Sequence, residues 1–142
     1  MNWFENWFNS KYYNILYSNR DNSEAIFLID NILKKFKPSK ESIFLDLGCG
    51  QGRHAIHLNR KGFITHGIDI SKKQLREAKK NENKNLKFYL SDMRNFNTKY
   101  KYNFILNLFT SFGYFEDNKN NQQVFNHVDK TLKKKGYFII DF

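Results

Sequence analysis

The first 38 residues carry hydrophobic side chains at the spacing of amphipathic helices. The pattern begins with four aromatic residues on one helix face: Trp3, Phe4, Trp7 and Phe8. A second helix is predicted between a capping residue at Asn22 or Ser23 and the helix-breaking Pro38. We therefore expect residues 1–38 to form an N-terminal helical cap.

After Pro38 the pattern changes to short apolar runs that alternate with polar, helical stretches. Five strands are predicted, over residues 43–47, 63–70, 86–90, 102–108 and 137–142. Helices are predicted between them, over residues 52–61, 71–80 and 118–135. Strands that alternate with helices are typical of a parallel sheet with helices on its faces. We expect residues 39–142 to form a Rossmann-like, doubly wound α/β domain with a mostly parallel sheet of about five strands.

The composition is that of one globular domain of 142 residues, with 40% hydrophobic and 27% charged positions. The single cysteine, Cys49, excludes an internal disulfide and a zinc cluster, and the four histidines lack the paired short spacings of metal ligands. We therefore expect no metal. No apolar run approaches the roughly 20 residues of a spanning helix, and the first residues do not form a secretion signal. These features favour a cytoplasmic protein without a membrane partner.

The net charge of +10 raises the question of a nucleic-acid partner. The excess is almost entirely lysine in a chain that is also rich in asparagine, whereas recognition of phosphates and bases favours the planar fork of arginine. The tightest cluster, Lys133–Lys135, precedes Gly136 and is expected at the C-terminus of the last helix, where cations complement the helix dipole. The charge pattern therefore argues against nucleic acid.

A glycine-rich turn follows the first predicted strand. Asp46 ends that strand, and Gly48, Gly50 and Gly52 follow it at alternate positions before a predicted helix. Glycines let a backbone adopt positive φ and pass close to a ligand, and the next helix offers unpaired N–H groups. The spacing G-x-G-x-G differs from the G-x-G-x-x-G of dinucleotide turns. A carboxylate beside the turn suits a ligand with an ammonium or sulfonium group, such as a cationic amino-acid nucleoside.

Two further aspartates end the next two predicted strands. Asp69 lies about 20 positions after Gly48, the offset at which an acidic residue pairs with ribose hydroxyls. Asp92 ends the third strand, where its carboxylate could meet an adenine amino group and Met93 could pack on the ring. Because parallel strands bring their carboxyl ends to one edge of the sheet, we expect these side chains to lie close together.

The chain resembles class I S-adenosylmethionine-dependent methyltransferases, in particular small bacterial members with an N-terminal helical cap. The resemblance rests on residues 46–52 (DLGCGQG), 67–71 (GIDIS), 92–93 (DM), 102–115 (YNFILNLFTSFGYF) and 135–141 (KGYFIID). The fold of this family continues past the fifth strand with a further helix and two strands, so we expect this chain to lack those final strands. Residues 137–141 would then form an exposed sheet edge through which chains could self-associate.

The resemblance implies S-adenosylmethionine as cofactor and a role for each motif. The turn formed by Gly48, Cys49 and Gly50 would lie against the methionine part, with Asp46 orienting its ammonium group. Asp69, with its neighbour Ile70, would bind the ribose. Finally, the remaining implied contacts are Asp92 and Met93 to the adenine, Asn107 to the methionine part and the methyl group, and Tyr13 as an aromatic that closes over the cofactor.

The expected activity is methyl transfer to a small-molecule acceptor. Methyl transfer is an in-line displacement that depends on alignment, so no catalytic residue is assigned, and His54 and His57 are interpreted as a histidine pair on a helix surface. By family resemblance, methylation of adenine N6 or of glutamine often goes with a Pro-Pro-aromatic turn, which the residues after Asn107 lack. Two alternatives stay open: an incomplete or degenerate domain that binds S-adenosylmethionine without turnover, and a nucleotide-binding oxidoreductase, which the glycine spacing disfavours.

Overall fold

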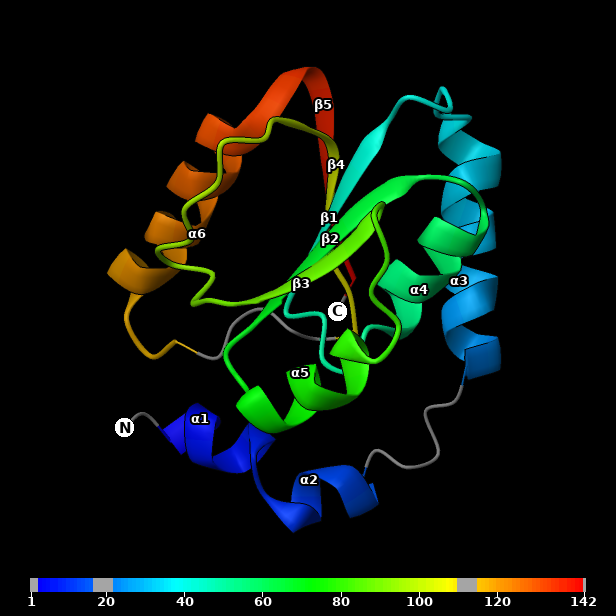
Figure 1. The fold of residues 1–142 in the computed structure, drawn as a ribbon. Coiled ribbons are helices and arrows are strands. Elements are labelled where there is room, and N and C mark those ends of the chain that lie inside the picture. The colour runs from blue at the N-terminus through cyan, green and yellow to red at the C-terminus, as the bar shows by residue number, and fades with distance from the viewer. Residues whose placement is uncertain (1–2, 17–21, 110–114, 142) are drawn as a thin grey trace.

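The computed structural model describes residues 3–16, 22–109 and 115–141, and Figure 1 shows their arrangement. Five strands form one sheet in the order β3-β2-β1-β4-β5, and each pairing between them is parallel. The strands are β1 (Ile43–Leu47), β2 (Ile64–Asp69), β3 (Leu86–Leu90), β4 (Tyr102–Asn107) and β5 (Leu132–Ile140). The helices are α1 (Trp3–Phe8), α2 (Lys11–Leu16), α3 (Asn22–Phe36), α4 (Arg53–Arg60), α5 (Lys72–Lys79) and α6 (Asn118–Thr131).

The order of the strands creates a switch point at the centre of the sheet. The chain runs outward from β1 through β2 to β3 and then returns to place β4 on the other side of β1. Ligands of such sheets bind at the carboxyl ends of the strands, beside the point where the order reverses. The topology therefore places a candidate site where β1 ends and α4 begins.

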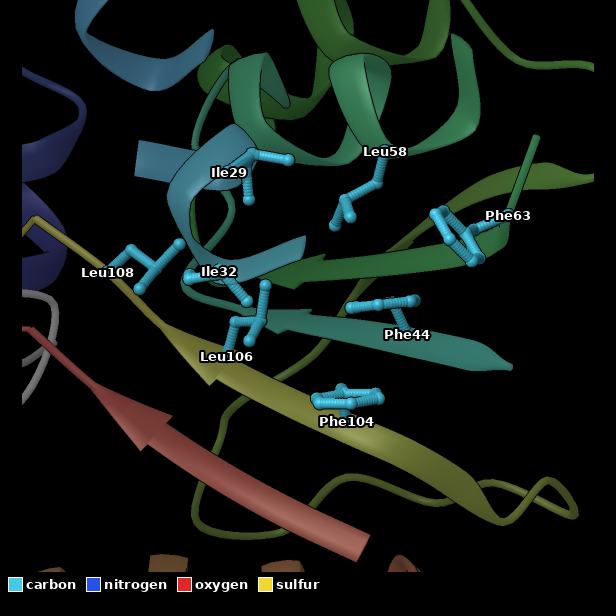
Figure 2. Close-up of a cluster of buried hydrophobic side chains, with 8 residues drawn as sticks. All are labelled: Ile29, Ile32, Phe44, Leu58, Phe63, Phe104, Leu106 and Leu108. Atoms are coloured by element: carbon cyan, nitrogen blue, oxygen red, sulfur yellow. The ribbon is translucent and has the colours of Figure 1, made fainter. Parts of the chain in front are cut away.

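Helices α3 and α4 cover one face of the sheet and bury the cluster drawn in Figure 2. The rings of Phe44 on β1 and Phe104 on β4 stack with centroids 4.8 Å apart. Ile29 and Ile32 of α3 and Leu58 of α4 pack over these strands. Helix α3 therefore contributes to the core of the sheet domain itself.

Helix α6 covers the opposite face, as Figure 1 shows. Leu45 and Leu47 of β1 point to this side, because neighbouring residues of a strand alternate between faces, and they pack with Val124 and Val128 of α6. With helices on both faces, the predicted doubly wound α/β fold is confirmed. No helix within the described ranges is long and apolar enough to cross a membrane.

Helices α1 and α2 lie beside α5, near the carboxyl ends of the strands (Figure 1). The Ser71 hydroxyl donates a hydrogen bond of 2.6 Å to Oδ1 of Asn9, and the side-chain amide of Gln74 donates one of 3.5 Å to the carbonyl of Phe8. Ser71 also caps α5, since its hydroxyl accepts the N–H of Gln74. One buried serine therefore both starts α5 and holds the segment that follows α1.

The predicted boundaries of the first four strands are within one or two residues of those observed. Helix α4 begins at Arg53 rather than at residue 52, because Gly52 is its N-cap with a left-handed backbone at φ 83°. Strand β4 ends at Asn107, one residue before the predicted end. The predicted end of the last strand, Phe142, lies outside the described residues.

The boundary between the last helix and the last strand was predicted wrongly. Helix α6 ends at Thr131, and Leu132 already has an extended backbone and begins β5. The lysines 133–135 therefore lie in β5 and not at a helix C-terminus. Tyr102 pairs with Leu132 but Phe104 pairs with Tyr137, so β5 accommodates extra residues in an irregularity where Lys135 has φ 65°.

Candidate functional site

The turn between β1 and α4 requires glycine. Gly48, Gly50 and Gly52 all have positive φ, at 70°, 56° and 83°. The N–H groups of Gly48 and Cys49 both donate to the carbonyl of Ile68 at 2.9 Å, which fastens the turn to β2. A Cβ on Gly50 would meet no described atom within 4 Å, so this glycine leaves one side of the turn open. The turn thus presents bare backbone to the space above β1.

Asp69 connects this turn to the start of α5. Its Oδ2 accepts the N–H of Gly50 at 2.8 Å, and its Oδ1 accepts the N–H of Ser71 at 2.8 Å. Burial raises the pKa of Asp69, while the backbone N–H groups of Ser71, Gly50 and Ile70 oppose that rise by stabilising the carboxylate. Asp69 therefore has a structural role, fixing the glycine turn, that sequence reasoning missed.

Asp46 is almost fully buried, with 1% of its surface exposed. Its Oδ2 has no hydrogen-bond partner among the described residues. Burial, followed by the charge of Asp69, raises the pKa of Asp46 to about 8. A buried acidic group with an unsatisfied oxygen is uncommon in native proteins, and a cationic partner would satisfy it.

A pocket of about 600 Å³, counting the space at its open mouth, lies at the carboxyl edge of the sheet. The glycine turn and the ends of β2 and β3 form its floor, and aromatic side chains of α1 and the start of α2 form part of its wall. The aromatic residues that line it are Phe4, Phe8, Tyr13 and Phe115. Its size and mixed polar and apolar lining are those of a small-molecule site.

Six of the predicted site residues line this one pocket: Gly48, Gly50, Asp69, Ile70, Asp92 and Met93. Tyr13, which was expected to close over a ligand, also lines it. The structure therefore brings the ends of three strands and the N-terminal segment to a single cavity, although 84 positions of sequence separate Phe8 from Asp92.

Three predicted residues, Asp46, Cys49 and Asn107, are not among the described residues that line the pocket. Cys49 packs its side chain beside Leu75 of α5, and burial raises the pKa of its thiol. Asn107 is buried at the end of β4, where its amide donates 2.9 Å to the carbonyl of Leu47, and its Oδ1 finds no partner in the described part of the chain. The aromatic residues 112 and 114, which follow β4, lie outside the described residues.

Arg94 is a site component that sequence reasoning missed. The Arg94 guanidinium donates hydrogen bonds to the Asp92 carboxylate, from Nη2 to Oδ2 at 2.6 Å and from Nε to Oδ1 at 3.0 Å. Burial acts to raise the pKa of Asp92, but the hydrogen bonds and charge of Arg94 outweigh it and hold the pKa below its usual value. The signal available in the sequence was the Asp-x-Arg spacing at residues 92–94, directly after a strand.

The interpretation of His54 and His57 as a surface pair was wrong for His54. His54 is buried at 6% exposure, its ring lies edge-on to Phe109 with centroids 4.5 Å apart, and burial lowers its pKa to about 4. His57 instead bonds through Nε2 to Oδ1 of Asp30 on α3 at 2.8 Å. The two histidines differ because α4 turns His54 toward the sheet and His57 toward α3.

Comparison with known proteins adds a family and several relatives. A family model described as a methyltransferase domain matches residues 38–141. The dTDP-3-amino-3,4,6-trideoxy-alpha-D-glucopyranose N,N-dimethyltransferase of Streptomyces venezuelae is 28% identical over 104 residues, which is 72% of this chain and 43% of that protein.

Two solved structures share the fold at lower identity. An S-adenosylmethionine-dependent methyltransferase from Clostridium acetobutylicum ATCC 824 has a TM-score of 0.75 at 24% identity, over 91% of this chain and 53% of its own. The sugar N-methyltransferase KedS8 from Streptoalloteichus sp ATCC 53650 has a TM-score of 0.76 at 21% identity, over 91% of this chain and 52% of its own. This chain therefore spans about half the length of the proteins it resembles.

Proposed function

This chain belongs to the methyltransferase domain family, and on that premise we propose that it binds S-adenosylmethionine and transfers a methyl group to a small-molecule acceptor. The observation that carries the proposal is one pocket that is lined both by Gly48 and Gly50 of the turn and by Asp69 and Asp92. An amino-acid nucleoside has a charged amino-acid end, a ribose and a base, and this pocket offers groups suited to each.

The polar groups of the pocket support this fit. Asp69 already accepts the Gly50 and Ser71 N–H groups and is also stabilised by the Ile70 N–H, yet a carboxylate has about four acceptor positions, so it retains capacity for at least one ribose hydroxyl. Asp92 and Met93 would bind the adenine at the end of β3. The open side of Gly50 would leave room for the methionine part beside the turn.

Two buried polar groups behind the turn support a cationic ligand. The unpaired Oδ2 of Asp46 would be satisfied by an ammonium group, which would also favour the ionised form of this carboxyl. The unpaired Oδ1 of Asn107 would offer a second acceptor near the methionine part. We propose that both residues orient the ligand, and that the glycine turn moves slightly on binding so that they can reach it.

The chemistry requires alignment more than acid–base assistance. When bound, S-adenosylmethionine supplies a methyl group on a positively charged sulfur, which becomes a neutral thioether on transfer. The chain's contribution is to fix the reacting geometry and to exclude water, and Phe4, Phe8 and Tyr13 are placed to cover the pocket. No residue of this chain is assigned a proton transfer.

We further propose an amine-bearing sugar as the first acceptor class to screen. This choice rests on the names of two relatives, which describe methylation of a nucleotide-linked amino sugar and sugar N-methylation. A neutral amine can attack without a base, which agrees with a site that has no assigned catalytic residue. Binding of S-adenosylmethionine without turnover is the alternative function. The match to a methyltransferase domain argues against a nucleotide-binding oxidoreductase.

Calorimetric titration with S-adenosylhomocysteine tests the proposal. We expect the wild-type chain to bind, and Asp69→Asn and Asp69→Ala to weaken binding by roughly thirtyfold or more, because charge-assisted hydrogen bonds to the ribose are lost. Asp129→Asn, an exposed position on α6, is the matched control and should bind like the wild type. A folded wild-type chain that gives no heat with S-adenosylhomocysteine but a thermal shift with a nicotinamide dinucleotide would contradict the assignment.

A further inference from the structure

The Asp92 carboxylate at the end of β3 is held by one side chain. Arg94 donates to it through three groups: its backbone N–H at 2.8 Å to Oδ1, Nε at 3.0 and 3.1 Å to the two oxygens, and Nη2 at 2.6 Å to Oδ2. A fork of this kind fixes both the position and the rotation of a carboxylate. Each oxygen accepts one donor of its own, the backbone N–H on Oδ1 and Nη2 on Oδ2, and the two oxygens share Nε, so the remaining acceptor capacity of Asp92 is divided between them.

The same guanidinium group also contacts the aromatic wall of the pocket. It lies over the ring of Phe115 at 4.6 Å from the centroid and over that of Phe4 at 5.8 Å. Those two rings meet each other edge to face, with centroids 5.3 Å apart. A further bond of 3.4 Å runs from Nη1 to Oδ1 of Asn120 on α6. Arg94 thus contacts Asp92, Phe4 and Phe115 at the same time.

Arg94 itself is not among the described residues that line the pocket, whereas Asp92, Phe4 and Phe115 are. Its effect on a ligand must therefore pass through those three neighbours. Stacking on an aromatic ring and forked binding of a carboxylate are both geometries that arginine provides and lysine does not.

We propose that Arg94 is the positioning residue for base recognition. It holds Asp92 in place as the acceptor for the amino group of a 6-amino purine, and it also positions Phe4 and Phe115, which line the pocket. This inference rests on the proposed function, since it takes the base end of a bound S-adenosyl compound to lie at Asp92. An ionised carboxylate can accept a hydrogen bond from a 6-amino group, but it repels the oxygen of a 6-oxo purine. The fork with Arg94 keeps Asp92 in that ionised form.

The test compares two ligands that differ at position 6 of the base, an amino group in one and an oxo group in the other, and in the proton that N1 of the 6-oxo form carries. S-adenosylhomocysteine and its hypoxanthine analogue, S-inosylhomocysteine, are titrated calorimetrically into the wild type, Arg94→Ala, Arg94→Lys and Arg94→Gln. We expect the wild type to prefer the adenine ligand at least tenfold. Arg94→Ala and Arg94→Gln should reduce that preference to less than about threefold, with Arg94→Lys between them because it keeps the charge but not the fork.

Three further variants complete the test. Asp92→Asn should also lose the preference, and adding Arg94→Gln to it should change the preference little, because both act on the same contact. Arg76→Ala, an exposed arginine on α5, is the matched control and should keep the wild-type preference.

The outcomes separate the two hypotheses. If Arg94→Gln lowers the affinity for both ligands by the same factor, Arg94 only maintains the structure. If Arg94→Gln changes neither affinity, Arg94 does not position Asp92. Either result overturns the inference. A folded wild-type chain that binds neither ligand would instead overturn the proposed function, and the inference with it. Because Arg94→Gln and Arg94→Lys keep a long side chain, the comparison remains decisive where Arg94→Ala fails to fold.

Discussion

Asp46 shows at the scale of one residue how the site departs from a purely structural core. It lies at the end of a central strand, almost without exposed surface, with one oxygen that no described group satisfies. Such a group costs stability in the folded chain whenever it is charged. A position of this kind is expected where ligand binding, rather than stability, determines the residue.

This cost predicts a pH dependence of stability. The pKa of Asp46 rises from its usual 3.8 to about 8, so the folded chain holds the proton more tightly than the unfolded chain. The stability that Asp46 contributes is therefore fully present below about pH 4 and is lost as the pH rises toward about 8. We predict that the free energy of unfolding of the wild type falls relative to that of Asp46→Asn across this range, by at most about 1.4 kcal/mol per pH unit.

Urea unfolding at a series of pH values measures this difference. Asp129→Asn, which changes an exposed aspartate on α6, should follow the wild-type curve. If the Asp46→Asn and wild-type curves also run parallel, Asp46 is not protonated in the folded chain.

Gly52 provides a second test at the residue scale. A Cβ at this position would lie 2.6 Å from Cζ of Phe88, whose ring is 1% exposed, and the backbone has φ 83°. We expect Gly52→Ala to reduce the free energy of unfolding by about 2–4 kcal/mol, from overpacking together with backbone strain. Gly62→Ala is the control, since Gly62 also has positive φ but its Cβ would point into open space.

Thermal and urea unfolding of the two glycine variants distinguish the causes. Gly62→Ala should cost only the strain, about 1 kcal/mol. Equal losses in the two variants would show that contact with Phe88 contributes nothing to the requirement for glycine at position 52.

At the scale of elements, the start of α5 connects three parts of the molecule. The Ser71 N–H donates to Asp69 of β2, and its hydroxyl caps α5 and bonds to Asn9 after α1. The pocket lies between these elements, so the position of the α1 aromatic residues depends on this junction.

We predict that Ser71→Ala both destabilises the chain and alters α1. The loss of a helix cap and of one further hydrogen bond should lower the free energy of unfolding by about 1–2 kcal/mol. The two tryptophans of the chain, Trp3 and Trp7, both lie in α1, so intrinsic tryptophan fluorescence reports on that helix. Ser71→Ala should therefore change the emission of the folded chain.

The matched control is Asp117→Ala, which removes the cap of α6. Its carboxylate accepts the N–H of Lys119 at 2.8 Å, so its loss should cost about 1 kcal/mol without changing the tryptophan emission. Identical emission from both variants would mean that the Ser71 to Asn9 bond does not hold α1.

At the scale of the whole molecule, β5 forms one edge of the described sheet. It pairs with β4 on one side, and Tyr137 is 50% exposed. An apolar strand edge can pair with another chain. The net charge of +10 opposes close approach of two copies, so association through this edge should strengthen as salt is added.

We predict that light scattering shows an apparent mass that rises with protein and salt concentration. Tyr137→Lys should reduce this association by adding charge to the edge, whereas Tyr12→Lys, at an exposed position on α2, should not. A stable monomer under all conditions would refute self-association through β5.

Local patterns were sufficient where the signal is a property of neighbouring residues. The alternation of apolar runs with polar helices predicted the parallel sheet, and most boundaries followed from glycines and caps such as Ser71. The start of β5 was missed because three lysines before a glycine, Lys133–Lys135, are typical of a helix C-terminus. In the structure they belong to β5, which pairs with β4. His54 was missed because burial depends on how α4 is turned against the sheet.

The order of strands and helices, the glycine turn and the three aspartates near strand ends could all be predicted from the sequence, since each depends on residues that are neighbours in the chain. Tertiary structure alone decided which of those residues share a pocket. It buried Asp46 and Asn107 behind the turn, made Asp69 the anchor of Gly50 and Ser71, and brought Arg94 into contact with Phe4 in α1 and with Phe115 before α6. Those relations depend on distances across the fold, and no local pattern of side chains encodes them.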